Sequence, residues 1–215
     1  MGASEAQELV NALRHELGIQ TDFTQLLLAF ALLCAAFFGV YELLSLTIIE
    51  GLGSTVLVSS VALTGGLLAW SLVGLKPQPK ARPDRAVLGP GLVLFACLLV
   101  IAALIVGGGA GVTTTIAGAV LGGVGMGAAY PLLSSEPFST GRPAATVGTL
   151  IAFAETAATA WVAMLAGGLY SALHGQGWTP VGALQLVFVV LAGVALAATV
   201  LAAARRSRRA RDDPA

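Results

Sequence analysis

Two continuous apolar runs separated by a glycine-rich junction decide the fold. They are Val87–Val106, VLGPGLVLFACLLVIAALIV, and Val112–Leu133, VTTTIAGAVLGGVGMGAAYPLL, with GGGAG between them at 107–111. A helix needs about 20 apolar residues to cross the hydrocarbon core of a bilayer. Each run has this length and contains no charged residue. Because lipid offers the backbone no hydrogen-bond partner, the runs predict two membrane-spanning helices, antiparallel across a tight turn.

The rest of the chain repeats this pattern. Four more runs qualify and bring the predicted spans to six: Leu26–Ile49, Thr55–Leu75, Ala144–Leu173 and Val181–Ala203. The 215-residue chain is 57% hydrophobic and 10% charged, whereas a soluble domain carries about 25% charged residues. This composition excludes a disordered chain and a nucleic-acid-binding module. The runs also lack the alternation of barrel strands, so we expect an all-α membrane protein with six transmembrane helices.

The basic residues predict the orientation. All 11 fall on one side of a six-span arrangement: Arg14, Lys76, Lys80, Arg82, Arg85, Arg142, Arg205, Arg206, Arg208, Arg209 and Arg211. The positive-inside rule makes that side cytoplasmic, with both termini inside. An odd number of spans would break the pattern. We therefore expect a multi-pass protein of the plasma membrane.

The N-terminal residues 1–22 are amphipathic rather than uniformly apolar. Ser4 with Gln7 matches a capping box, and three leucines recur at helical spacing: Leu9, Leu13 and Leu17. We expect a short helix over Gly2–Gly18 that lies on the cytoplasmic membrane surface and ends at Gly18. A tail without fixed structure is the alternative.

Two further domain boundaries follow. Residues 23–204 form the six-span membrane domain, and residues 205–215 form a basic cytoplasmic tail, which we expect to be disordered. The tail's arginines fit a topology anchor better than a patch for anionic lipid or nucleic acid. The lipid bilayer is thus the expected surrounding, and no nucleic-acid partner is expected.

Two acids lie inside predicted spans. Glu42 is in the outer half of the first span, and Glu155 is near the middle of the fifth. Inserting a central acid costs about 2.5–3.5 kcal/mol, so such residues usually face a bundle interior or a water-filled cavity. No Lys or Arg lies in any span to pair with them. A carboxyl group that gains and loses a proton in a cavity suits proton coupling.

Neighbours at helical spacing extend these two acids into candidate substrate- and proton-binding faces. Tyr41 and Ser45 accompany Glu42, and Thr156 and Thr159 accompany Glu155. The alternative for each acid is a neutral, hydrogen-bonded bundle residue without a transport role. Two other acids, Glu50 and Glu136, lie at span ends, where we expect them to be solvated.

The fourth predicted span is rich in glycine. Its glycines form two GxxxG pairs with one glycine between them: Gly118, Gly122, Gly123, Gly125 and Gly127. Small residues let membrane helices approach closely, and they also permit bending during a conformational cycle. We expect close packing, with a hinge as the alternative.

Enzymatic functions find little support. The two histidines, His15 and His174, lie on opposite sides of the predicted membrane, and no HExxH, GxSxG, P-loop or acidic metal motif is present. Cys34 and Cys97 lie within apolar runs and match no metal-binding or disulfide spacing. We expect no enzyme activity, no metal and no cofactor.

Three stretches resemble the C-terminal half of actinobacterial-type major facilitator superfamily transporters. YELLSLTIIEGLGSTVLVSSVALTGGLLAWSLVG, Tyr41–Gly74, is similar to the family's seventh and eighth spans, with Glu42 on the acid of that pattern. GGVGMGAAYPLLS, Gly122–Ser134, looks like the tenth span. Ala144–Gly168 resembles the eleventh, which commonly carries an acid, here Glu155. The resemblance covers most of the chain from Leu26 to Ala203.

The resemblance implies a six-helix half-bundle, made of two inverted three-helix repeats, that faces a second half across a substrate cavity. It also implies proton-coupled export of small, often amphipathic compounds. Two departures bear on gating: the loop at 76–85, KPQPKARPDR, lacks the family's usual Asp/Arg cluster, and the usual proline near Ser45 is missing.

Two functional hypotheses remain from the sequence. The first is one half of a major-facilitator-type secondary transporter, which needs a second six-span half or a second copy and moves a small-molecule substrate. The alternative is a non-transporting membrane subunit or truncated transporter fragment that acts through helix–helix packing.

Overall fold

The computed structural model describes residues 3–76 and 84–212, which are almost entirely helical and contain no strand. Six long helices carry the fold: α1 (Ala3–Leu46), α2 (Val56–Gly74), α3 (Asp84–Val106), α4 (Gly108–Ser135), α5 (Ala144–Gly175) and α6 (Pro180–Asp212). A π-helical turn, η1 (Thr47–Gly51), continues α1, and a 3-10 turn, η2 (Glu136–Thr140), follows α4. The predicted all-α class is confirmed.

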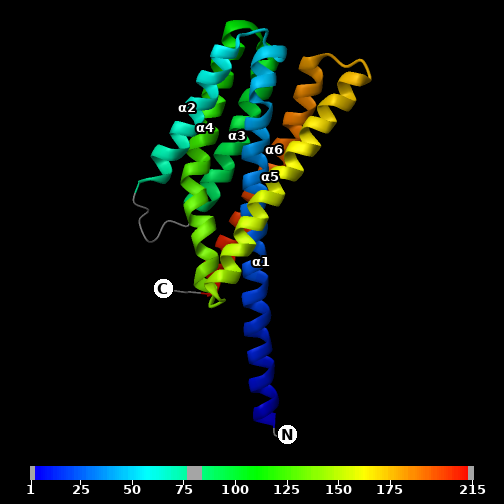
Figure 1. Cartoon of the computed structure of the whole chain (residues 1–215). Helices are drawn as coiled ribbons and strands as arrows, with labels where there is room; N and C mark the ends of the chain where they lie inside the picture. Colours follow the sequence, from blue (N-terminus) through cyan, green and yellow to red (C-terminus); the bar gives the residue numbers. More distant parts are fainter. Residues whose placement is uncertain (1–2, 77–83, 213–215) are drawn as a thin grey trace.

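Each predicted span falls on one of these helices. Within the described residues, six helices are long and apolar enough to cross a membrane. The apolar part of α1 is Thr21–Gly51, and that of α6 is Pro180–Ser207. In Figure 1 the chain's two ends lie toward the same end of the bundle, as an even number of crossings requires.

The core forms where bulky side chains of α1 and α6 meet apolar residues of α3, α4 and α5. The largest fully buried side chains include Phe30 and Phe37 of α1 and Phe188 of α6. Helix α1 contacts α4, α5 and α6, while α4 packs against α2 and α3. Figure 1 shows α2 and α5 at opposite edges of the bundle. These two edge helices have the least buried apolar stretches of the six.

The helix packing follows a regular pattern. The six most extensive contacts pair α3 with α4, α2 with α4, α3 with α6, α1 with α5, α1 with α6, and α1 with α4. Exchanging α1 with α4, α2 with α5 and α3 with α6 maps this set onto itself. Under this exchange, the main partners of the first three helices therefore correspond to those of the last three.

The junction between α3 and α4 is shorter than expected. Only Gly107 separates the two helices, since α4 already begins at Gly108. Both residues have positive φ angles, 71° and 55°, which only glycine adopts without strain. The predicted glycine turn is therefore present, but it is compressed to one residue.

The expected end of the N-terminal helix at Gly18 is wrong. Helix α1 runs without a break from Ala3 to Leu46, so the amphipathic segment and the first span are one helix. A glycine inside a helix costs about 1 kcal/mol relative to alanine, which is too little to stop a helix that a long apolar segment continues. In Figure 1 this N-terminal part extends beyond the bundle. Residues 1–2 of the predicted segment lie outside the described residues.

The expected disorder of the tail is wrong up to Asp212, because α6 continues to that residue. Alanine and arginine favour helix, and Arg205 anchors the first turn of the tail. Its Nη1 donates to Glu136 Oε2 of η2 at 2.7 Å, and Arg205 is buried. Glu136 is thus not simply solvated, as expected, but joins α6 to the α4–α5 connection. Residues 213–215 lie outside the described part.

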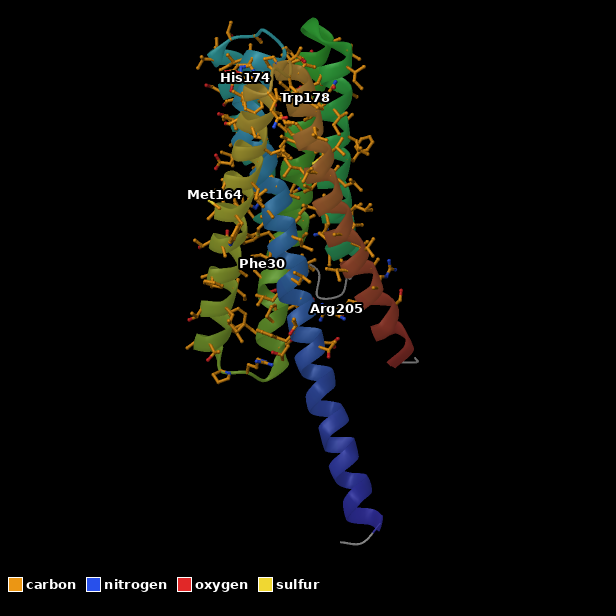
Figure 2. All side chains as sticks on the ribbon, turned by 90° about the vertical axis from the view of Figure 1, so that its right-hand side faces the viewer. Phe30, Met164, His174, Trp178 and Arg205 are labelled. Atoms are coloured by element: carbon orange, nitrogen blue, oxygen red, sulfur yellow. The ribbon has the colours of Figure 1, made fainter. Side chains whose placement is uncertain are left out.

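This ion pair yields a stability prediction. In Figure 2, Arg205 lies toward the end of the bundle opposite His174 and Trp178. Glu136→Gln would leave the Arg205 charge buried without its carboxylate. We expect a loss of about 1–3 kcal/mol, between the values for exposed and fully buried pairs. Denaturant titration in detergent measures it.

The double variant Arg205→Met/Glu136→Leu is the matched control for that prediction. It should recover most of the stability, because replacing both charges leaves no charge unpaired. A Glu136→Gln protein as stable as the parent would show that the pair contributes nothing.

Candidate functional site

Glu155 lies near the middle of α5, and a tyrosine of α4 holds its carboxyl group. Glu155 is partly buried, and its Oε2 accepts a hydrogen bond of 2.9 Å from the hydroxyl of Tyr130 on α4. Tyr130 lies one residue before Pro131, within the last two turns of α4. The carboxyl group therefore meets a fixed donor rather than a bare apolar wall.

The Tyr130 ring belongs to an aromatic cluster, which we define as Phe30, Phe37, Phe38, Tyr41, Trp70 and Tyr130. Ring centroids lie 5.3 Å apart for Phe30 and Tyr130 and 5.8 Å apart for Trp70 and Tyr130. Trp70 of α2 also meets Phe37 at 5.5 Å and Phe38 at 6.1 Å. Such distances are typical of stabilising ring pairs. The cluster joins α1, α2 and α4 beside the Glu155 carboxyl group.

Part of this cluster is accessible. Phe30 and Phe37 are buried, but the other four rings are partly exposed. Four of the six rings are therefore partly accessible, and Glu155 lies beside one of them through the hydrogen bond to Tyr130.

The three predicted residues around Glu42 differ in their surroundings: Tyr41 and Ser45 contact neighbouring helices, whereas Glu42 is exposed. The Tyr41 hydroxyl donates to the backbone carbonyl of Ala119 at 3.3 Å, and Ser45 accepts from Ser59 at 2.7 Å. Both contacts hold α1 to neighbouring helices. Glu42 is exposed and forms no hydrogen bond or ion pair with any other described residue. The structure therefore ties Glu155, and not Glu42, to the aromatic cluster.

Helix α5 exposes two chemically different stripes. One contains only small or polar residues: Thr149, Ala152, Thr156 and Ala160. The other is bulky and apolar: Phe153, Trp161, Met164 and Leu165. Figure 2 shows Met164 on the side of α5 that faces away from the bundle. Thr159, which was predicted with Thr156, is only partly exposed because it lies closer to the packed side.

Helix α2 is divided in the same way. Residues three or four positions apart form a mostly polar exposed stripe: Ser60, Thr64, Leu67 and Ser71. A second exposed stripe is fully apolar: Leu57, Val61, Leu68 and Leu72. Helices α2 and α5 therefore each expose two stripes of different polarity, and the hydroxyls of Ser60 and Thr149 donate to carbonyls of their own helices.

The glycines of α4 lie at close helix contacts on two sides. A Cβ atom at Gly123 would collide with the backbone carbonyl of Gly66, and one at Gly127 would lie 2.6 Å from that of Trp70, both on α2. A Cβ at Gly125 would lie 2.6 Å from the carbonyl of Gly89 on α3.

The first GxxxG pair meets α3 as well. A Cβ at Gly118 would lie 3.2 Å from the Ala96 carbonyl, and one at Gly122 would lie 3.4 Å from the Ala96 side chain. The two predicted GxxxG pairs therefore serve different neighbours, α3 and α2. This geometry is what close packing requires, and it fixes the helix that carries Tyr130.

A second tyrosine–carboxylate pair lies near the C-terminal end of α5. The Tyr170 hydroxyl donates to Glu50 Oε2 at 2.6 Å, and the Tyr170 ring stacks on His174 with centroids 5.9 Å apart. Glu50 is exposed, as expected, but it also joins η1 to α5. Within the described part of the chain, the ring of His174 is the one aromatic ring in contact with that of Tyr170, so the pair lacks a cluster like that at Glu155.

An apolar groove of about 460 Å³ lies between α1, α5 and α6. Small residues such as Ala35 and Ala166 and larger ones such as Trp161 and Val190 line it. Its lining includes no residue that exchanges a proton. Among the described residues, no group of three His, Cys, Asp or Glu side chains is arranged to hold a metal ion.

Comparison with known proteins gives no relative: no family model, curated protein or solved structure matches this chain. The resemblance to major facilitator transporters therefore rests on the sequence stretches alone.

Proposed function

We propose that this chain is one half of a major-facilitator-type secondary transporter that moves a small molecule across the plasma membrane in exchange for protons. The observation that carries the proposal is the Glu155 carboxyl group. It is partly exposed in the middle of an apolar helix, bonded to Tyr130 and flanked by accessible aromatic rings.

A carboxyl group at that depth is costly in lipid, and buried acids in spans usually mark ion or substrate pathways. Glu155 and Glu42 both reach the surface of this six-helix bundle. A surface that carries two acids at membrane depth calls for water or a polar partner beside it. Coverage by a second six-helix unit provides a water-filled cavity between the two.

The stripes on α2 and α5 support the same arrangement. The bulky apolar stripes suit acyl chains, whereas the small and polar stripes suit a cavity or a closely packed helix. The symmetry of the main helix pairs, in which α1–α3 correspond to α4–α6, is expected of two inverted repeats in one half of such a transporter.

In this proposal Glu155 binds and releases the coupling proton. When ionised, it accepts the Tyr130 hydrogen bond and favours a wet, open cavity. When protonated, it loses its charge and tolerates the drier environment that follows rocking of one half against the other. The basic residues at the helix ends hold both termini in the cytoplasm, and so they fix which side of the transporter faces the cytoplasm.

Reconstitution tests the proposal. The full chain is placed in liposomes with a trapped pH-sensitive dye, and ethidium, an anionic dye and a neutral aromatic compound are added in turn. We expect at least one of them to move protons faster than in protein-free liposomes. No proton movement with any of them, from a protein that native mass spectrometry finds to be a monomer, would favour a non-transporting membrane subunit.

A further inference from the structure

We infer that the binding site takes an organic cation with an aromatic or apolar body. The inference rests on the proposed function, since it names the substrate class of the same site. It is carried by the juxtaposition of the Glu155 carboxyl group, through its bond to Tyr130, with the partly exposed rings of the aromatic cluster.

The charged residues at the site determine whether it favours a cationic or an anionic ligand. The chain has no Lys or Arg between residues 24 and 75, 87 and 133, or 144 and 203, which together include every residue of the site. Among the residues that the structure describes, Glu155 therefore has a hydroxyl donor in Tyr130 but no cationic side chain that pairs with it. In an environment of low dielectric constant, a ligand cation supplies the missing charge, whereas an anion is repelled.

The rings add to this preference. The face of an indole attracts a cation more strongly than that of the other aromatic rings, within about 6 Å of the ring centroid. Trp70 is partly exposed and lies among Phe37, Phe38 and Tyr130. A bulky cation at this position gains ring faces for its charge and apolar area for its body.

A contact between a cation and an aromatic ring already occurs elsewhere in the bundle, at the end where Arg142 lies. The Arg142 guanidinium carbon lies 4.3 Å from the centre of the Phe23 ring, between the start of α5 and α1. Phe23 is two helical turns from Phe30, on the same helix as most of the cluster. Cation–ring contact is thus compatible with the geometry of this bundle.

The test uses two probes of the same shape and opposite charge, tetraphenylphosphonium and tetraphenylborate. Their binding to the purified full chain in detergent is measured by equilibrium dialysis, with empty micelles subtracted. We expect saturable binding of the phosphonium and none of the borate. Glu155→Gln should weaken phosphonium binding at least about tenfold, or ~1.4 kcal/mol.

Glu50→Gln is the matched control, because it removes one carboxylate that also accepts a tyrosine hydrogen bond, at the far end of α5. It should leave phosphonium binding unchanged. Trp70→Leu should also weaken phosphonium binding, because it removes the indole face, and this variant gives a second readout if Glu155→Gln fails to fold.

The failures of the two proposals are distinguishable. Saturable borate binding, or phosphonium binding that Glu155→Gln and Trp70→Leu both leave intact, overturns the cation inference. Proton movement with the anionic dye would then still support transport. Phosphonium binding that depends on Glu155, in a protein that moves no protons, supports the cation site and overturns the proposed function.

Discussion

Glu155→Gln should reduce substrate-linked proton movement in proteoliposomes to the level of protein-free liposomes. Glutamine has nearly the shape of glutamate, and its amide oxygen still accepts the hydrogen bond that Tyr130 donates at 2.9 Å. It does not exchange a proton in the physiological range. The variant therefore removes the proposed coupling step while leaving the packing of α4 and α5 intact, and thermal unfolding in detergent checks that packing.

Glu50→Gln is again the control for this effect, since it makes the same chemical change beside Tyr170. It should retain proton movement. Glu42→Gln should have a smaller effect than Glu155→Gln, because Glu42 has no bond to the aromatic cluster. Unchanged flux in Glu155→Gln would remove Glu155 from the mechanism.

Gly123→Leu should destabilise the bundle by about 3 kcal/mol, the upper part of the usual cost of overpacking. The Cβ atom alone would collide with the Gly66 backbone carbonyl of α2, and a carbonyl in a helix has no rotamer by which to move away. Helices α2 and α4 would have to separate, which also displaces Trp70 from Tyr130. The measurement is the free energy of unfolding in detergent, compared with that of the parent chain.

The control for overpacking is Gly168→Ala on α5. No atom lies within 4 Å of a Cβ built at that glycine, so the substitution should be neutral or slightly stabilising, as alanine favours helix. Gly123→Ala should fall between the two. Equal stability of Gly123→Leu and the parent would show that α2 and α4 do not approach as closely as described.

The sequence predicted the helices well because each is a continuous apolar run, and lipid leaves such a run no other structure. It failed at the ends of α1 and α6. At α1 the prediction relied on Gly18 to end the helix, but the helix continues through it. At α6 the prediction relied on the polarity of the tail, but the Arg205–Glu136 contact holds the first turn of the tail in the helix. The Arg205–Glu136 contact joins residues 69 positions apart, so no local sequence pattern predicts it.

The sequence predicted only part of the candidate site. Acids within apolar runs are conspicuous, so Glu42 and Glu155 were found, but the difference in their exposure and hydrogen bonding was not. Periodicity places residues on one face of one helix, whereas the aromatic cluster takes rings from three helices. Trp70 and Tyr130 are 60 residues apart, and only the close approach of α2 and α4 through Gly123 and Gly127 brings their rings together.

The central claim is that the small and polar stripe of α5 faces a water-filled cavity, while its bulky stripe faces lipid. Spin labels on Thr156→Cys and Trp161→Cys test this, in a chain whose two buried cysteines are replaced by alanine. The two sites lie on different sides of one helix, about 7.5 Å apart along its axis.

In reconstituted membranes, the label at 156 should be relaxed mainly by a water-soluble nickel chelate, and the label at 161 mainly by oxygen dissolved in the lipid. If oxygen dominates at both positions to the same degree, Thr156 lies against acyl chains, and the cavity beside Glu155 does not exist.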